Sequence, residues 1–252
     1  MTIIDRIHLR TRGFSALQYC HPLRYGWLAL GGVVATGAAV WVVRTGVLDG
    51  TDRSLFRWFN SAPDGLYRPL WAMQLIGVLG APLVVAVGAA TARRYRLAAA
   101  MMLLPLVKLA VEFDILKQLV WHPRPGAAIS GAVLRDVPLA GPAFPSGHAI
   151  ILFGMATLLC PYLGIRWCSV VFGAVTAAVL VRVYLGAHTP LDVLGGAAAG
   201  LTVGAALNLV VGVPGTGAGA GSPIGHAETR PKTLPARGTR WHRAGESRKG
   251  RT

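Results

Sequence analysis

The sequence predicts an all-α membrane protein, a six-transmembrane-helix bundle in which the loop between the third and fourth helices carries part of a functional site. Hydrophobic residues make up 53% of the 252 residues, and charged residues make up only 14%. Uncharged apolar runs recur along the chain, and a helix needs about 20 such residues to cross a bilayer. This composition excludes an ordinary soluble domain.

Short polar or basic segments separate the expected spans. Arg44 closes the first span, where a signal peptide would instead have a shorter apolar core and a small-residue cleavage site, so we expect this span to be retained. Small residues are frequent in the last span, which favours close helix packing. The spans are expected at residues 25–43, 69–92, 97–117, 149–165, 167–186 and 190–213.

The third span is apolar only as far as Val107, and charged residues follow it at helical spacing. A charge at membrane depth costs about 2.5–3.5 kcal/mol on insertion scales, so such residues normally face the bundle interior or a wet cavity. Lys108 and Glu112 are four residues apart and are expected to pair. Lys117 lies further along the helix, near the membrane surface, where a site could use it.

The charge distribution predicts three parts: a basic cytoplasmic segment at 1–24, the membrane domain at 25–213 and a disordered basic cytoplasmic tail at 214–252. Basic residues concentrate in flanks and tail, so the net charge of +15 indicates topology rather than nucleic-acid binding. The side that holds both termini carries 16 Lys and Arg against 8 opposite, although the two sides are equal without the tail. The positive-inside rule places that side in the cytoplasm. An Arg, Ala, Gly and Val bias indicates a GC-rich bacterial genome, so we expect the membrane to be a bacterial cytoplasmic membrane.

Residues 182–192, Arg-Val-Tyr-Leu-Gly-Ala-His-Thr-Pro-Leu-Asp, place a cation, a histidine and a carboxylate between two apolar runs. Thr189 followed by Pro190 is typical of a helix start. His188 then lies just before the helix, and the Asp192 carboxylate in its first turn can reach the imidazole. A carboxylate that holds one ring nitrogen leaves the other free to attack or to accept a proton. Taken alone, the segment favours a helix cap beside a surface histidine, because short motifs have many false positives.

The predicted topology brings three separate stretches to the outer membrane face, and together they favour an anion. Arginine forks match phosphate oxygens in a bidentate way, and a helix start offers free backbone N–H groups. The candidate residues are Lys117, Arg124, Ser146, Gly147, His148, Arg182, His188 and Asp192.

A zinc site built from the histidines is disfavoured, because three nearby cations would repel the ion. We expect no metal and no cofactor, and we interpret His122 as a hydrogen-bonded loop residue. The three cysteines, Cys20, Cys160 and Cys168, have no metal-type spacing and give no case for a disulfide framework.

The stretches KQLVWHPRP (117–125), PSGH (145–148) and RVYLGAHTPLD (182–192) resemble the three signature motifs of the type 2 phosphatidic acid phosphatases. That superfamily includes lipid phosphate phosphatases, undecaprenyl-pyrophosphate phosphatases and vanadium haloperoxidases. The resemblance covers residues 25–213 and implies the integral membrane branch. One departure is Val181, because the third motif usually opens with Ser at that position; its loss removes a possible hydrogen bond near the phosphate.

The resemblance implies that His188 is the nucleophile, that Asp192 orients it, and that His148 protonates the leaving oxygen. Phosphoryl oxygens would be held by Lys117, Arg124, Ser146, Gly147 and Arg182. We therefore expect a metal-independent membrane phosphatase that acts at the extracytoplasmic face on phosphatidic acid, phosphatidylglycerol phosphate or undecaprenyl pyrophosphate. The expected partners are this lipid substrate and membrane lipids, without nucleic acid. Two alternatives are a phosphotransferase with a lipid or sugar acceptor and a non-catalytic lipid-binding or transport protein.

Overall fold

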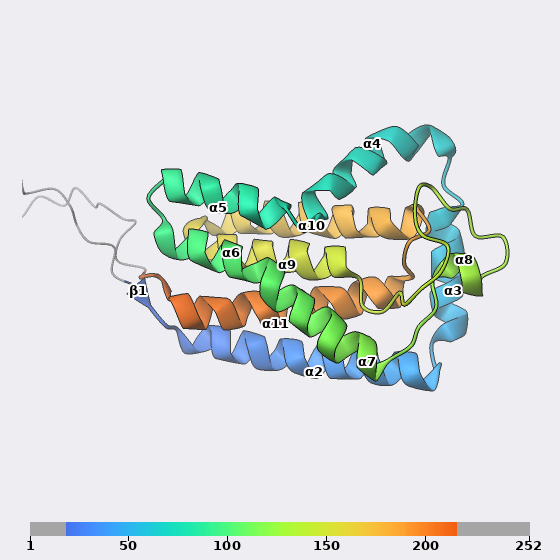
Figure 1. Ribbon diagram of the computed structural model, residues 1–252, viewed down its shortest axis with the longest axis horizontal. Helices are drawn as coiled ribbons and strands as arrows, with labels where there is room; N and C mark the ends of the chain where they lie inside the picture. Colours follow the sequence, from blue (N-terminus) through green and yellow to red (C-terminus); the bar gives the residue numbers. More distant parts are fainter. Residues whose placement is uncertain (1–18, 216–252) are drawn as a thin grey trace, which may run out of the picture. The chain divides into compact units, whose positions relative to one another are not determined.

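The computed structural model describes residues 19–215, which form a bundle of helices with one two-residue strand pair (Figure 1). The predicted tail from residue 216 and the first 18 residues lie outside the described part. The helices are α2 (Leu23–Thr45), α3 (Asp49–Asn60), α4 (Tyr67–Met73), α5 (Ala81–Thr91), α6 (Tyr95–Leu109), α7 (Lys117–Leu119), α8 (Pro125–Ala128), α9 (Gly147–Leu159), α10 (Ile165–Tyr184) and α11 (Pro190–Val211). Shorter turns are η1 (Asp64–Leu66), η2 (Gln74–Gly77), η3 (Ala110–Leu116) and η4 (Cys160–Tyr162), and β1 (Tyr19–Cys20) pairs antiparallel with β2 (Val213–Pro214).

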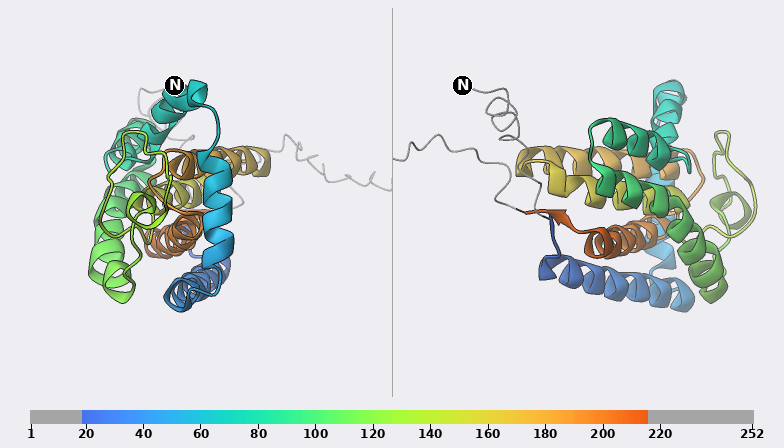
Figure 2. Two further views of the ribbon diagram at one scale, coloured as in Figure 1. Left: turned by 90° about the vertical axis from the view of Figure 1, so that its right-hand side faces the viewer. Right: turned by 60° about the vertical axis from the view of Figure 1, so that its left-hand side comes forward.

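Helix α11 is the central element of the bundle, and it packs against α2, α6 and α9. The short helices α3 and α8 and the long connection between α7 and α9 gather at one end, where α9 and α11 also begin (Figures 1 and 2). The strand pair lies at the other end, beside the end of α11 (Figure 1). The helix starts that were predicted to carry the site thus share one end of the bundle.

The expectation of an all-α membrane protein is confirmed in its coarse form, whereas the count of six spans remains a prediction. Among residues 19–215, three helices are long and apolar enough to cross a membrane, namely α2, α10 and α11. A fourth span results if Asp64–Gly77 and Ala81–Thr91 count as one, although the two parts meet at an angle of 62°. Helix α6 ends at Leu109 and α9 has only 13 residues, so neither reaches the length of about 20 residues by itself.

A seam of glycines joins α11 to α9. A Cβ atom at Gly196, Gly200 or Gly204 would lie 2.5, 2.6 or 2.8 Å from a backbone oxygen of residues 146–154. Only glycine lets the two backbones come this close, as in other membrane bundles where small residues sit between helices. The seam sets how far α9 stands along α11, and so it sets the relative positions of their first turns.

The end of the bundle away from the helix starts is tied by different contacts. Cys160 and Cys168 form a disulfide across the turn between α9 and α10, where their Cα atoms lie 5.1 Å apart. Their spacing of eight residues gave no indication of this bond, since only the tight turn brings them together. The Arg96 guanidinium lies over the Tyr19 ring at 4.2 Å.

Candidate active site

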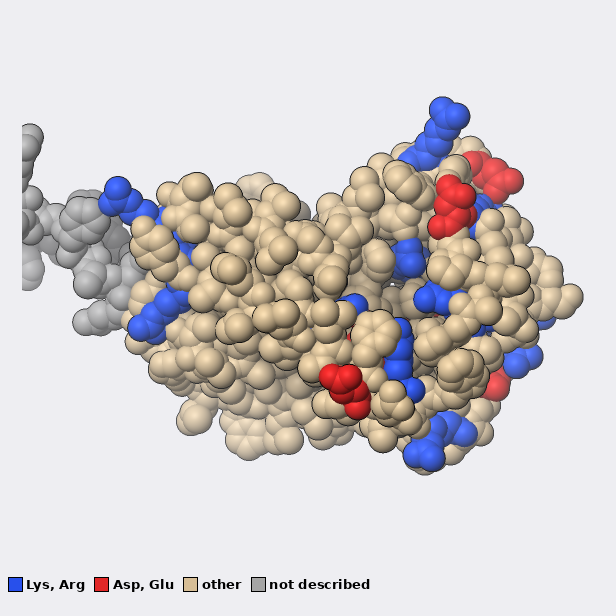
Figure 3. Space-filling view, viewed as in Figure 1, with Lys and Arg blue, Asp and Glu red and all other residues tan. Residues whose placement is uncertain are grey.

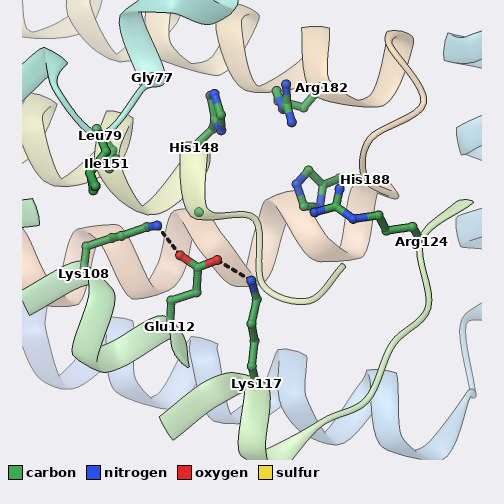
Figure 4. Close-up of a pocket in the computed structure, with 11 residues that line it drawn as sticks. Gly77, Leu79, Lys108, Glu112, Lys117, Arg124, His148, Ile151, Arg182 and His188 are labelled. Carbon is green, nitrogen blue, oxygen red and sulfur yellow. Dashed lines mark hydrogen bonds and ion pairs between the residues drawn. The ribbon is translucent and has the colours of Figure 1, made fainter. Parts of the chain in front are cut away.

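A cavity of about 220 Å³ opens at the site end of the bundle and collects most of the predicted residues (Figure 4). Six of them line it: Lys117, Arg124, Gly147, His148, Arg182 and His188. The other two, Ser146 and Asp192, are fully buried next to it, and the Ser146 N–H donates to the Asp192 carbonyl at 3.0 Å. Lys and Arg side chains surround this hollow on the face shown in Figure 3. The structure therefore brings all three motifs to one place.

The PSGH stretch forms the start of α9. Ser146 is the extended residue before the helix, and the helix proper begins at Gly147. The first N–H groups of a helix have no partner within it and carry the positive end of the helix dipole. The Ser146 hydroxyl also lacks a hydrogen-bond partner, although it is fully buried. This helix start can receive an anion.

His188 is buried beside the Asp192 carboxylate, but the two are not hydrogen-bonded. Its Nδ1 lies 3.7 Å from Asp192 Oδ2, which is ion-pair range and longer than a hydrogen bond. The same oxygen accepts the Thr189 N–H at 2.8 Å and so caps α11. The predicted helix start is thus confirmed, while the contact that was predicted to orient His188 is longer than expected.

The other carboxylate oxygen of Asp192, Oδ1, is hydrogen-bonded to His122 Nδ1 at 2.8 Å. Sequence reasoning interpreted His122 as a hydrogen-bonded loop residue, and the structure confirms this. Its partner, which was not predicted, is the carboxylate behind His188. The available signal was its position in the first motif, two residues before Arg124. Across a gap of 70 residues, no spacing rule links it to Asp192.

The pKa values of the two histidines beside Asp192 are shifted in opposite directions. Burial lowers the pKa of His188, Asp192 opposes this shift, and the cations Arg182 and Arg124 add to it, so the pKa lies below 6.5. Burial also lowers the pKa of His122, but its hydrogen bond and charge interaction with Asp192 outweigh burial and raise the pKa above 6.5. His188 is therefore the neutral imidazole and His122 the better cation.

The two arginines of the site are held by groups from distant segments. The Arg124 guanidinium donates to the Ala187 carbonyl at 3.1 Å, one residue before His188. The Arg182 guanidinium donates to the Gln74 side chain, while its Nε has no partner. Gln74 lies on η2, in the bent second span, and is buried. Sequence reasoning did not single it out, because a lone glutamine in an apolar segment carries no motif.

Val181, the departure from the family motif, lies outside the cavity lining. Its side chain is buried in an apolar cluster with Tyr184 and Leu185, packed against Leu70 and Met73 of α4. The predicted loss of a hydrogen bond near the phosphate remains untested, but the valine itself serves helix packing.

Lys117 is paired with Glu112, whose Oε1 lies 2.6 Å from the lysine Nζ. The predicted ion pair between Lys108 and Glu112 is confirmed as well, so one carboxylate holds two lysines (Figure 4). Lys108, Glu112, Gly77, Leu79 and Ile151 complete the cavity lining, and none of them was predicted as a site residue.

Within residues 19–215, no group of three or more His, Cys, Asp or Glu side chains is placed to hold a metal ion. The charged groups that line the cavity are mostly cations, which suits an anionic ligand and disfavours a divalent cation.

Comparisons with known proteins agree with this geometry. A family model described as the PAP2 superfamily matches residues 93–213. The structure is similar to that of LpxE from Aquifex aeolicus, with a TM-score of 0.53 and 26% identity over 61% of this chain and 92% of that one. It is also similar in fold to a transmembrane PAP2 type phosphatidylglycerolphosphate phosphatase from Bacillus subtilis, with a TM-score of 0.55, 19% identity and coverage of 74% and 95%. No curated protein matches the sequence.

The matched region contains all three motifs and every residue predicted for the site. Its apolar helices and its similarity to two membrane phosphatases identify an integral membrane protein. The part of the chain from residue 93 to residue 213 thus matches the PAP2 superfamily, and the described structure is similar in fold to two proteins of that kind.

Proposed function

We propose that the protein hydrolyses a lipid phosphate or lipid pyrophosphate at the extracytoplasmic face of a bacterial membrane, without a metal ion, through a phosphohistidine on His188. One observation carries the proposal: a buried cavity places two histidines among Lys117, Arg124 and Arg182 at the start of a helix. Phosphoryl transfer depends mainly on positioning and on stabilisation of negative charge, and these groups supply both.

The reaction takes two steps. The Nε2 lone pair of His188 attacks phosphorus, the bond from phosphorus to the leaving oxygen breaks, and His148 gives that oxygen a proton. Water then attacks the phosphohistidine, its proton passes to His148, the phosphorus–nitrogen bond breaks, and inorganic phosphate leaves. Each histidine returns to its starting state, as covalent catalysis requires.

The lowered pKa of His188 supports its role as nucleophile, because a neutral imidazole has a free lone pair at neutral pH. Nδ1 faces Asp192, which leaves Nε2 as the attacking nitrogen. Hydrogen bonds from His122 and from the Thr189 backbone fix the carboxylate in place. Asp192 thus acts as a fixed negative charge that stabilises the imidazole when it becomes positive.

The lipid chain is accommodated by the apolar part of the cavity. Leu79 and Ile151 line it on the side away from Arg124 and Arg182 (Figure 4), and Leu79 lies at the bend between η2 and α5. A lipid chain extending there stays among apolar side chains while its phosphate reaches His188. The positive-inside distribution supports an outer-face location, since it places the loops of the site opposite the basic turn at 93–96.

The test is phosphate release by the detergent-purified protein in excess EDTA. The substrates are phosphatidic acid, phosphatidylglycerol phosphate and undecaprenyl pyrophosphate, each with wild type, His188→Ala and the control His21→Ala, an exposed histidine at the opposite end. We expect release that survives EDTA, persists in the control and falls by at least about a thousandfold in His188→Ala. Loss of release in EDTA would contradict the metal-free mechanism, and a phosphorylated acceptor in place of free phosphate would identify a transferase.

A further inference from the structure

Glu112 lies inside the cavity between two lysines, and the proposed reaction gives it no role. Its carboxylate contacts Lys108 Nζ through one oxygen and Lys117 Nζ through the other. The Glu112 side chain is 5% exposed, and those of Lys108 and Lys117 are 10% and 11% exposed. Buried charges are costly unless they are paired, and here one carboxylate pairs with two lysines, so the three side chains form one buried unit rather than a surface ion pair.

A local change in helix geometry creates this unit. In a regular α-helix, residues five apart point in directions that differ by about 140°, so Glu112 and Lys117 would not meet. Residues 110–116 form the π-helical turn η3, whose wider winding brings residues five apart to the same side. The turn therefore directs Lys117 to the carboxylate that already pairs with Lys108.

The carboxylate stands where a phosphoryl group is expected. A Cβ atom on Gly147 would lie 2.6 Å from Glu112 Oε2 and 2.9 Å from Lys108 Nζ, so the pair presses against the first residue of α9. Helix starts favour anions, and this one already has the Glu112 carboxylate beside its first residue.

We propose that Glu112 is a specificity-determining residue: by pairing with Lys108 and Lys117 it limits the negative charge that the cavity accepts, and so favours lipid phosphate monoesters over lipid diphosphates. This inference rests on the proposed phosphatase function and names the substrate class of that same site. Glu112 acts on charge, and it takes no part in bond formation.

The charges of the lining carry the argument. Four cations line the cavity, and Glu112 is the one acidic side chain among the described lining residues. A phosphate monoester carries about two negative charges at neutral pH, and a diphosphate carries about one more. The second phosphate belongs to the leaving group, beside His148, and so lies on the side where Lys108 is already neutralised. A buried carboxylate a few ångströms away disfavours the extra charge strongly, because screening is weak there.

The experiment compares wild type with Glu112→Gln, Lys108→Met and the double variant. The first change makes the cavity one charge more positive, the second makes it one charge less positive, and the double change restores the wild-type net charge. Asp114→Asn is the matched control, since Asp114 is an exposed carboxylate on the same turn. The measured quantity is the ratio of kcat/KM for undecaprenyl pyrophosphate to kcat/KM for phosphatidic acid, which does not depend on the fraction of folded protein.

We expect Glu112→Gln to raise the ratio by roughly tenfold, Lys108→Met to lower it by a similar factor, and the double variant to stay within about threefold of wild type. The control keeps the wild-type ratio. A purely structural role would reduce both activities together and leave the ratio unchanged, and this result would overturn the proposal. A lower ratio in Glu112→Gln would overturn it as well.

Binding gives a readout that does not need turnover. Calorimetric titration with inorganic phosphate and with methylenediphosphonate, which is not hydrolysed, should show the same pattern of relative affinities in the four proteins. A wild type that releases no phosphate from any lipid would refute the proposed function, yet the binding pattern would still decide the role of Glu112. Equal relative affinities in all four proteins would refute that role.

Discussion

At the site end of the bundle, several buried polar atoms have no hydrogen-bond partner, whereas at the opposite end a comparable buried group is hydrogen-bonded. Ser146 Oγ, Arg182 Nε and His188 Nδ1 have no hydrogen-bond partner, and all three belong to the cavity or its wall. At the far end, the buried Asn208 Nδ2 donates to the Thr157 carbonyl at 2.9 Å. A buried polar atom without a partner normally costs about 1–3 kcal/mol.

The difference shows how one bundle divides its tasks. One end satisfies its polar groups internally and adds a disulfide, which stabilises the fold. The other end keeps donors fixed in space and unpaired, so that a ligand can complete them without any rearrangement. Variants at the two ends should therefore separate activity from stability.

Acid should produce the largest loss of activity, because it titrates His188, the proposed nucleophile at the site end. His188 must be neutral to attack, and its lowered pKa keeps it neutral as pH falls to 6.5 and somewhat below. Below that pKa, activity should fall about tenfold for each further pH unit. Initial rates from about pH 5 to about pH 9 measure this.

Return of the acid-treated protein to neutral pH is the control, and full recovery separates titration from unfolding. The unfolded chain binds a proton more readily than buried His188 does, so stability also declines as pH falls below 6.5. A flat rate profile through this range would contradict the two-histidine mechanism.

A matched pair of buried amides should give the next largest contrast. Gln74→Leu removes the acceptor of Arg182 at the site end and should lower kcat/KM by about tenfold with little change in melting temperature. Asn208→Leu removes the bond to the Thr157 carbonyl and should cost about 1–3 kcal/mol of stability while activity stays within about twofold. Thermal unfolding and kinetics, measured on the same preparations, show which variant loses stability and which loses activity. Equal losses of activity in both variants would contradict the proposed division between the two ends of the bundle.

The smallest effect on activity is expected from the disulfide. Cys168→Ser opens the bond to Cys160 and should lower the free energy of unfolding by about 2–3 kcal/mol, with activity within about twofold of wild type. Cys20→Ser is the control, since Cys20 is free and exposed. If Cys168→Ser inactivated the folded protein, the two ends would be coupled, contrary to the division described above.

Local patterns predicted the elements and residues whose chemistry is carried by neighbours in the sequence. Thr189-Pro190 marks the start of α11, Lys108 and Glu112 pair at a spacing of four, and the three motifs meet in one cavity. In the first two cases the relevant distance is set within one helix turn, whereas the meeting of the three motifs was expected from the predicted topology and the family resemblance.

Features that depend on tertiary structure escaped prediction. The bond from His122 to Asp192 crosses 70 residues, and the bond from Arg182 to Gln74 crosses 108, so packing alone decides them. The contact of Glu112 with Lys117 requires a π turn, which an α-helical period does not indicate. The span lengths also differed, because the third span changes winding after Leu109 and the second bends by 62°.

The glycine seam has a consequence for an enzyme dissolved in lipid. Bilayer thickness varies by a few ångströms between membranes, and transmembrane helices adjust to the local thickness, for example by tilting. Gly196, Gly200 and Gly204 interlock with α9 over about 12 Å, so a slip along the axis would have to break all three contacts at once. The two helices move as one body, and His148 and Asp192, one on each, move with it. The relative position of His148 and Asp192 should therefore not change with the thickness of the surrounding bilayer.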